Sequence, residues 1–198
     1  ISAVEASAHG INWTFAPMVD VGRDPRWGRV MEGSGEDPYL GTQVALARLR
    51  GFQTNDLSRN NTIMATAKHF AGYGFSESGR DYNTVDFGRQ TLLNVVLPPF
   101  EGLAKSGIGS FMNAFNDLNG IPANGDYYLQ RSILKEAWGF EGFIVSDWGS
   151  IRQMINHGYS RDLKQSAYHS ITSGNDMDME SEAYILHLKE LVEEGQVD

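Results

Sequence analysis

The sequence predicts an α/β protein built around a parallel sheet. Short apolar runs alternate with segments of helical periodicity along its 198 residues, and this alternation is typical of βαβ units. Two runs, Ala65–Ala67 and Phe143–Val145, are nearly all apolar, as expected of strands that are buried on both faces. Polar residues follow several runs directly, and the C-terminal ends of strands are where barrel and doubly wound folds place their chemistry.

The expected elements follow one another in a regular order. The strand candidates are Trp13–Ala16, Thr62–Lys68, Gly109–Asn113, Phe143–Asp147 and Asp176–Met179. The helix candidates are Asp37–Gln53, Arg89–Lys105, Tyr127–Trp138, Leu163–Ser173 and Glu182–Glu194. These strands are too few for a complete (β/α)8 barrel, which usually needs about 250 residues, and the opening residues look like a helix without a preceding strand. We therefore expect residues 1–198 to be part of a single TIM-type (β/α)8 barrel domain that is incomplete at its N-terminal end.

Composition and charge exclude several classes of function. The formal net charge is −9 and no run of basic residues occurs, so nucleic acids and anionic membranes are not expected as partners, because both need a positive surface. No stretch approaches the roughly 18 consecutive apolar residues of a transmembrane helix. There is no cysteine and no phosphate-binding or dinucleotide-binding glycine motif, and the histidines lack zinc-site spacing. We expect no cofactor and no metal.

The acidic residues Asp176, Asp178 and Glu180 alternate along the chain in a way that suggests a calcium loop. The glycine and the distal glutamate of an EF-hand loop are absent. Met177 and Met179 stand between the acids and are typical of the core side of a strand. We therefore expect a strand here rather than a calcium site.

Asp147 is the first candidate for a catalytic residue. The buried strand that precedes it would hold its carboxylate within the tight tolerance that nucleophilic attack on an anomeric carbon requires. Trp148 follows directly and offers a flat apolar face on which a sugar ring can stack. The spacing fits equally well an aspartate that caps the N-terminus of the next helix, so both interpretations stay open from the residues alone.

Lys68 and His69 end another predicted strand. Two adjacent donor or cationic side chains can bind sugar hydroxyl groups and offset the charge of a nearby carboxylate. The alternative is a lysine at the rim and a histidine that is hydrogen-bonded in the core. The loop Asp24–Arg29 contains two arginines, and we expect one of them to face a ligand through its planar guanidinium, while most other charges there form salt bridges.

Several segments, taken in this order, resemble the N-terminal barrel domain of glycoside hydrolase family 3. They are Ile11–Pro17 leading into Asp24–Arg29, Glu36–Tyr39, Lys68–Phe70, Gly79–Asn83 and Val145–Trp148. Each motif alone is weak, but their common order over nearly the whole chain is highly specific. The loop Ala71–Ser76 carries no histidine, which favours the β-glucosidase or β-xylosidase branch of the family over its N-acetylglucosaminidases.

The resemblance implies hydrolysis of terminal nonreducing β-linked glucosyl or xylosyl residues by a retaining double displacement. Asp147 would be the nucleophile that forms a glycosyl-enzyme intermediate. The side chains around the sugar would be Arg29, Lys68, His69, Phe115, Trp148 and Met179. Phe115 stands where family members often carry a tyrosine, so it would keep the ring and lose the hydroxyl group. The family resemblance also favours a periplasmic or secreted location.

Two parts of the family's site are expected outside these residues. One is an aspartate that clamps the sugar hydroxyls and lies further upstream. The other is the general acid/base, a glutamate contributed by a second domain. We therefore expect the isolated chain to be inactive and to pack against the remainder of its own polypeptide or another copy of the chain. Two other interpretations stay open: a non-catalytic carbohydrate-binding remnant of such an enzyme, and an α/β interaction domain whose strand-end acids are caps and salt bridges.

Overall fold

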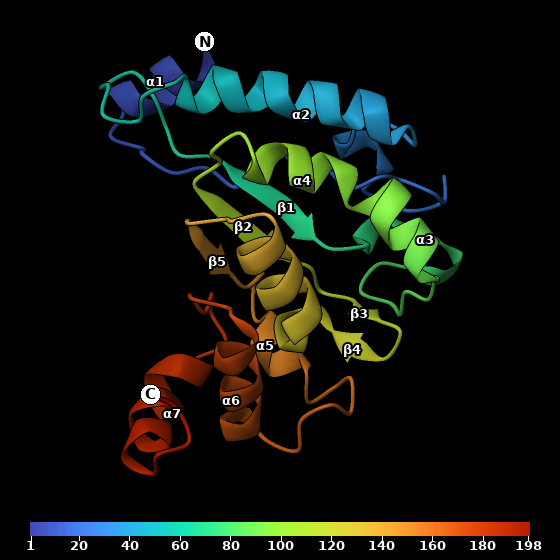
Figure 1. Ribbon diagram of the computed structural model, residues 1–198, viewed down its shortest axis with the longest axis vertical. Coiled ribbons are helices and arrows are strands. Elements are labelled where there is room, and N and C mark those ends of the chain that lie inside the picture. Colours follow the sequence, from blue (N-terminus) through green and yellow to red (C-terminus); the bar gives the residue numbers. More distant parts are fainter.

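Residues 1–198 are described by a computed structural model, in which helices cover a parallel sheet (Figure 1). The sheet has three strands in the order β1-β2-β5. Their bounds are Thr66–Phe70 for β1, Ser110–Asn113 for β2 and Phe143–Val145 for β5. All neighbouring strands are parallel, as the alternating pattern of the sequence predicted.

The two outermost predicted strands form isolated parallel bridges rather than strands. Trp13 pairs with Met64 and Met18 with Lys68 on the β1 side, while Met177 pairs with Val145 on the β5 side. Each of these edge segments has a strand on one side only, and Pro17 has no N–H to donate. The order of the predicted runs across the sheet is nevertheless confirmed, and it is the order of consecutive strands in a partial TIM-like barrel.

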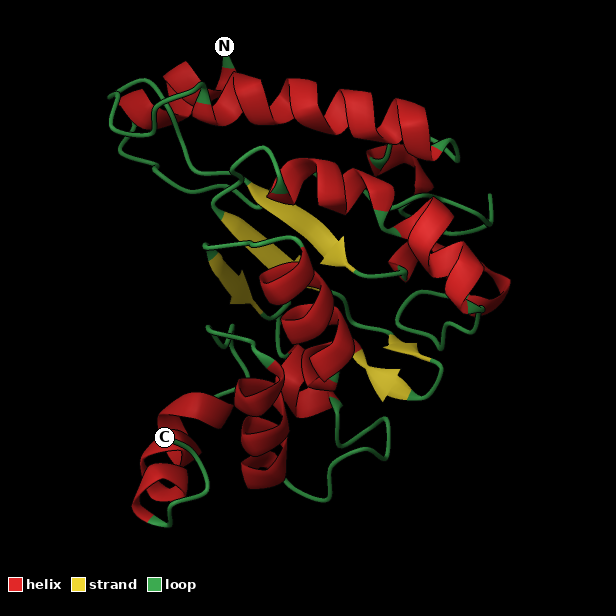
Figure 2. Cartoon of the chain, in the orientation of Figure 1, coloured by secondary structure: helices red, strands yellow, loops and turns green.

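Helices precede, separate and follow the strands along the chain (Figure 2). The longer ones are α1 (Ser2–Ala8), α2 (Pro38–Gln53), α4 (Pro98–Ala104), α6 (Leu163–Ser173) and α7 (Ala183–Glu193). The other elements are the short helices α3 (Arg89–Thr91) and α5 (Ser150–Gln153) and two π-helices, Leu92–Val96 and Tyr128–Ala137. The single helix expected over Arg89–Lys105 is thus divided, because Pro98 cannot donate a backbone hydrogen bond to the preceding turn. No helix is long and apolar enough to span a membrane.

A small antiparallel hairpin, which the sequence analysis did not predict, follows β2. Its strands are β3 (Asp117–Leu118) and β4 (Ile121–Pro122). Between them, Asn119 and Gly120 adopt φ angles of 52° and 83°, and an Asn-Gly pair with positive φ at both positions is the strongest short signal for a hairpin turn. The hairpin could therefore have been predicted from this dipeptide.

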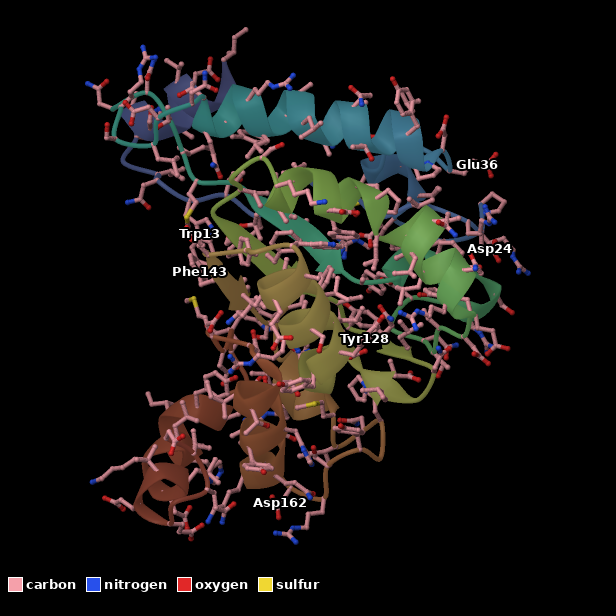
Figure 3. All side chains as sticks on the ribbon, in the orientation of Figure 1. Trp13, Asp24, Glu36, Tyr128, Phe143 and Asp162 are labelled. Carbon is pink, nitrogen blue, oxygen red and sulfur yellow. The ribbon has the colours of Figure 1, made fainter.

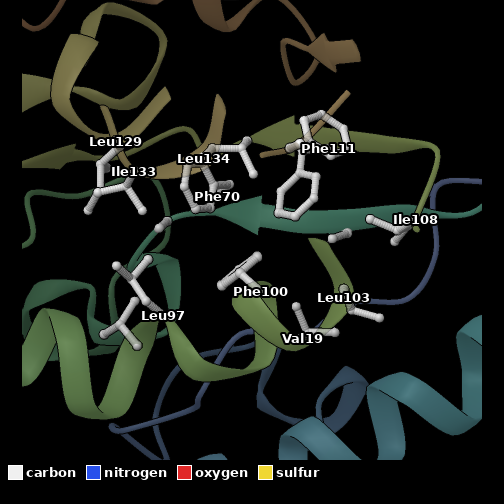
Figure 4. Close-up of a cluster of buried hydrophobic side chains, with 14 of the residues drawn as sticks. Val19, Phe70, Leu97, Phe100, Leu103, Ile108, Phe111, Leu129, Ile133 and Leu134 are labelled. Carbon is white, nitrogen blue, oxygen red and sulfur yellow. The ribbon is translucent and has the colours of Figure 1, made fainter. Parts of the chain in front are cut away.

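The helix-facing side of the sheet is an apolar core (Figure 4). Phe111 of β2 packs its ring 5.5 Å from that of Phe70 in β1, and Phe100 of α4 lies 5.4 Å from Phe70. Leu134 of the π-helix Tyr128–Ala137 and Leu97 join this cluster and are fully buried. This packing fixes β1 and β2 relative to the helices and so fixes where the strands end.

The opposite side of the sheet is only partly covered. The Trp13 indole N–H lies 2.8 Å from Thr66 Oγ1 and 3.1 Å from Ser110 Oγ, and its ring lies 5.3 Å from that of Phe143 (Figure 3). Thr66, Ser110 and Phe143 are register partners, so they share one face. Phe15, which packs on Trp13, is 42% exposed, and Met177 is 43% exposed. The prediction that Met177 lies in the strand core is therefore wrong.

Candidate active site

Three chain segments bring polar side chains together at the C-terminal ends of their strands. The segment before β1 ends at Asp20, β1 carries His69, and β5 leads into Asp147. The imidazole of His69 lies between the two carboxylates, with Nδ1 2.7 Å from Asp20 Oδ2 and Nε2 3.4 Å from Asp147 Oδ2. The side chains of Asp20 and His69 are both 1% exposed, whereas that of Asp147 is 13% exposed. Asp147 is thus the member that can meet a ligand.

Asp20 is the site residue that the sequence analysis missed. It stands between Val19 and Val21 in an apolar segment, and a lone acid in a buried run was the only local signal. Its Oδ2 accepts a hydrogen bond of 3.0 Å from the backbone N–H of His69 in addition to its contact with the ring. Its Oδ1 is buried and has no hydrogen-bond partner.

Asp147 does not cap the next helix. Its Oδ1 accepts a hydrogen bond of 2.7 Å from the backbone N–H of Trp148, while α5 begins after Gly149 and has no side-chain cap. Burial raises the pKa of Asp147, and the nearby His69, Lys68 and Arg29 oppose that rise. The carboxylate therefore lies among positive groups in a partly desolvated place, an environment typical of reactive carboxylates.

Lys68 and Arg29 supply the positive charge around Asp147. Lys68 is half-buried, and its pKa is lowered, first by this burial and then by the charge of Arg29. Arg29 forms two hydrogen bonds with Glu32, at 2.7 and 3.0 Å, which raise the pKa of its guanidinium. The guanidinium also lies 5.6 Å from the ring centroid of Tyr73, so an acid and an aromatic ring both contact it.

The second arginine of the same loop has a different environment. Arg26 binds Asp24 at 2.6 Å and its side chain is 69% exposed. Its hydrogen bonds lower the pKa of Asp24 to about 2. Arg26 therefore belongs to a surface pair, while Arg29 is the arginine that lies near Asp147.

Aromatic rings form a wall beside His69. The Tyr73 ring lies 5.0 Å from the His69 ring and 5.8 Å from that of Phe115, whose other neighbour is Tyr82 at 4.6 Å. Phe115 is 7% exposed. Trp148, by contrast, is 64% exposed beside Asp147, so its indole has a free face.

Met179 is held beside the end of β5 by its backbone. Its N–H donates to Ser146 Oγ at 2.8 Å and its carbonyl accepts from Gly149 N–H at 2.8 Å. The neighbouring acids have structural partners: Asp176 binds Lys135 Nζ at 2.8 Å and the N–H of Ile144, and Asp178 accepts from the start of α7.

The fold and this site define a class: a partial (β/α) barrel with a carboxylate, an imidazole and two cations at the C-terminal ends of its strands. The family model described as the glycosyl hydrolase family 3 N-terminal domain matches residues 1–198. The chain therefore belongs to glycosyl hydrolase family 3, as the sequence motifs indicated.

Known proteins related to this chain include proteins named β-glucosidase and β-xylosidase. The periplasmic β-glucosidase of Salmonella typhimurium is 42% identical over 197 residues, which are 100% of this chain and 26% of that protein. A β-xylosidase of Formosa agariphila is 37% identical over 183 residues, which are 90% of this chain and 25% of that protein. The chain thus spans about a quarter of the length of these curated relatives.

Solved structures agree with the fold described above. The crystal structure of a β-glucosidase from Listeria innocua superimposes with a TM-score of 0.96 at 41% identity, covering 100% of this chain and 28% of that chain. Other structures of the Listeria innocua enzyme were determined in complex with glucose or isofagomine. At this identity the likeness extends beyond the general fold to the domain of one family.

Proposed function

We propose that this chain supplies the nucleophile half of the active site of a retaining β-glycosidase that removes terminal nonreducing glucosyl residues. Asp147 attacks the anomeric carbon and forms a glycosyl-enzyme intermediate, which water then hydrolyses. The observation that carries the proposal is the placement of Asp147 at the end of β5, 13% exposed and 3.4 Å from His69 Nε2. A carboxylate that is held rigidly, partly desolvated and faced by cations suits nucleophilic attack.

The surrounding side chains have chemistry that suits sugar binding. Lys68 and Arg29 can donate hydrogen bonds to hydroxyl groups, and the planar fork of Arg29 can hold an adjacent pair. The exposed face of Trp148 can stack on a pyranose ring. Met179 beside the end of β5 and Phe115 in the aromatic wall provide apolar surface near these groups. In this proposal Phe115 packs against the aromatic wall and makes no polar contact with the sugar.

The general acid/base comes from elsewhere in the polypeptide. Retaining glycosidases need two carboxyl groups about 5–5.5 Å apart. Two carboxylates bound to the groups around Asp147 are already engaged, since Asp20 lies 2.7 Å from His69 and Glu32 lies 2.7 Å from Arg29. A glutamate of a second domain, packed over the strand ends, would complete the pair.

Further barrel units would also cover the exposed inner face of the sheet. Phe15 and Met177 are each more than 40% exposed there, and the edge segments at Trp13 and Met177 each pair on one side only. Open sheet edges and apolar faces readily pair with other chains. We therefore propose that this chain is one part of a longer polypeptide, and the matched share of its relatives supports this.

The substrate class and the location belong to the same proposal. Relatives named β-glucosidase and β-xylosidase support a β-glucoside, or an oligosaccharide with a terminal β-glucosyl or β-xylosyl residue, as the substrate. The relative named periplasmic β-glucosidase supports a periplasmic or secreted location.

The decisive experiment compares the full-length polypeptide with its Asp147→Ala and Asp147→Gly variants. We expect kcat for p-nitrophenyl β-glucoside to fall by at least about a thousandfold in Asp147→Ala, because removal of a nucleophile abolishes the covalent pathway. With azide and a dinitrophenyl β-glucoside, Asp147→Gly should yield the α-glucosyl azide, since azide attacks from the face that the carboxylate occupied. Asp24→Ala, which removes a surface carboxylate, is the matched control. Turnover by Asp147→Ala at the wild-type rate would show that the nucleophile assignment is wrong.

A second experiment uses the 198-residue chain by itself. We expect no turnover of p-nitrophenyl β-glucoside, because the acid/base is missing, and self-association in light scattering, because the inner face of the sheet is open. Turnover by the chain alone would contradict the assignment of the acid/base to another domain. A monodisperse monomer would contradict the proposed completion of the barrel.

A further inference from the structure

His69 lies between two carboxylates, and each of its ring nitrogens faces one of them. Asp20 Oδ2 lies 2.7 Å from Nδ1 and also accepts the backbone N–H of His69 at 3.0 Å. An ionised carboxylate can only accept hydrogen bonds, so Nδ1 must carry a hydrogen. On the other side, Nε2 lies 3.4 Å from Asp147 Oδ2.

A count of hydrogens shows which state of the ring suits two ionised carboxylates. In a neutral imidazole only one nitrogen carries a hydrogen, so Nε2 would direct a lone pair at the carboxylate of Asp147. A second proton makes both contacts attractive, because both ring nitrogens then carry hydrogens. If the proton on Nδ1 moves to Asp20, Nε2 still carries its own. In either arrangement Nε2 carries a hydrogen on the side of the ring that lies 3.4 Å from Asp147 Oδ2.

Asp20 has features that suit the control of this proton. Its side chain is 1% exposed, so its charge is poorly screened by water. Its Oδ1 has no partner, so its one counter-charge in direct contact is the His69 ring. Burying an unpaired carboxylate is costly, and a protonated imidazole removes that cost.

We propose that Asp20 is a positioning residue that keeps a hydrogen on Nε2 of His69, and that this hydrogen maintains Asp147 in its ionised, nucleophilic form. The inference rests on the proposed function, in which Asp147 is the nucleophile. It deepens that function by assigning a role to a carboxylate that does not touch the substrate. It also explains how a nucleophile with a pKa raised by burial stays ionised near neutral pH.

Several charged or titratable groups surround His69. They are Asp20, Asp147, Glu32, Lys68, Arg29 and Tyr73. Glu32 is bound to Arg29, and Lys68 and Arg29 act on Asp147 directly. Asp20 is the acid that contacts Nδ1, so its removal is the specific perturbation.

The test compares wild type, Asp20→Asn, His69→Gln and the double variant as full-length proteins. The substrate is a dinitrophenyl β-glucoside, whose leaving group needs no acid, so the missing acid/base does not shape the pH profile. In Asp20→Asn we expect the acid limb of the kcat/KM profile to move up by about one pH unit, the lower end of the effect of an adjacent opposite charge, so that kcat/KM falls about tenfold at pH values below the limb. In the His69→Gln background the same substitution should have little further effect, because Asp20 acts through His69.

Asp126→Asn is the matched control, because Asp126 is another buried carboxylate and accepts the N–H of Leu129 at a helix start. It should leave the pH profile unchanged. If Asp20→Asn does not fold, the ring nitrogens of His69 in wild type can be followed by ¹⁵N NMR of histidine-labelled protein, with His69→Gln for assignment. An Nε2 without hydrogen at neutral pH, or an Asp20→Asn profile identical to wild type, overturns the proposal. The azide product of Asp147→Gly tests the nucleophile separately and does not depend on Asp20.

Discussion

Asp147 and Asp178 lie at the ends of neighbouring segments of the same sheet, yet their carboxylates have opposite surroundings. Asp178 accepts hydrogen bonds from the backbone N–H groups of Ser181, Ala183 and Tyr184, at 3.1, 2.8 and 3.2 Å. Asp147 accepts only from the N–H of Trp148, and its remaining oxygen faces His69.

The difference separates a structural carboxylate from one that is available for chemistry. The lone pairs of Asp178 are occupied by the first turn of α7, so it gains little by meeting a ligand. Asp147 is partly desolvated and incompletely hydrogen-bonded, and its raised pKa reflects this. A strand-end aspartate is thus informative only when its partners are known, because both residues look alike in the sequence.

The largest effect expected from this comparison concerns Asp178. Asp178→Ala removes the acceptor of three backbone N–H groups, so we expect the free energy of unfolding to fall by about 2 kcal/mol. The rate for p-nitrophenyl β-glucoside should stay within twofold of wild type at temperatures where the variant is folded. Urea denaturation of the full-length protein, combined with the assay, measures both. A loss of activity without a loss of stability would make Asp178 a site residue and remove the contrast with Asp147.

A smaller effect of opposite sign is expected for Asp147→Asn. Burial raises the pKa of Asp147 in the folded protein above its value in the unfolded chain, which is about 4. Protonation of Asp147 therefore stabilises the fold fully below pH about 4, and this stabilisation is lost as the pH rises through the pKa of the folded state. The wild type therefore carries a buried charge at pH 7 that the variant lacks. We expect the variant to have the higher melting temperature at neutral pH, and the difference to vanish at acid pH. Thermal melts at several pH values measure it, and a lower melting temperature for the variant at neutral pH would contradict the prediction.

The parts of the fold that local signals mark were predicted well. Helix α6 spans Leu163–Ser173 as expected, because Asp162 caps its start and Gly174 ends it in the left-handed conformation. The strand runs were predicted in the right order because parallel strands buried on both faces are apolar throughout. The break at Pro98 was missed because helical periodicity continues across it, although proline itself was the signal.

The site was predictable only as far as its residues stand at strand ends. Lys68, His69 and Asp147 follow apolar runs, whereas Asp20 acts on His69 across 49 positions of sequence. No periodicity records such a contact, since it depends on how neighbouring strands align. Whether Asp147 caps the next helix also depended on geometry, because the cap of α5 is decided by backbone conformation at Gly149.

The smallest effect is expected for the two arginines of the loop Asp24–Arg29. They differ in the same way as Asp178 and Asp147, because one has a structural partner on the surface and the other lies near the site. Arg26 pairs with Asp24 on the surface, and water and salt screen such exposed pairs so strongly that they contribute little to stability. We expect Arg26→Ala to leave both the melting temperature and the kinetics of the full-length protein nearly unchanged. Arg29→Ala should raise KM for p-nitrophenyl β-glucoside, because its guanidinium is held by Glu32 and Tyr73 near Asp147.

The pair of variants is informative because the two side chains have the same charge and lie three positions apart in one loop. Loss of a positive charge from the loop is common to both, so a general electrostatic effect would alter KM equally. A selective effect of Arg29→Ala would assign the change to its place near Asp147. Equal effects would show instead that the loop acts as a whole. The contacts of an arginine would then not tell a structural arginine from one that binds the substrate.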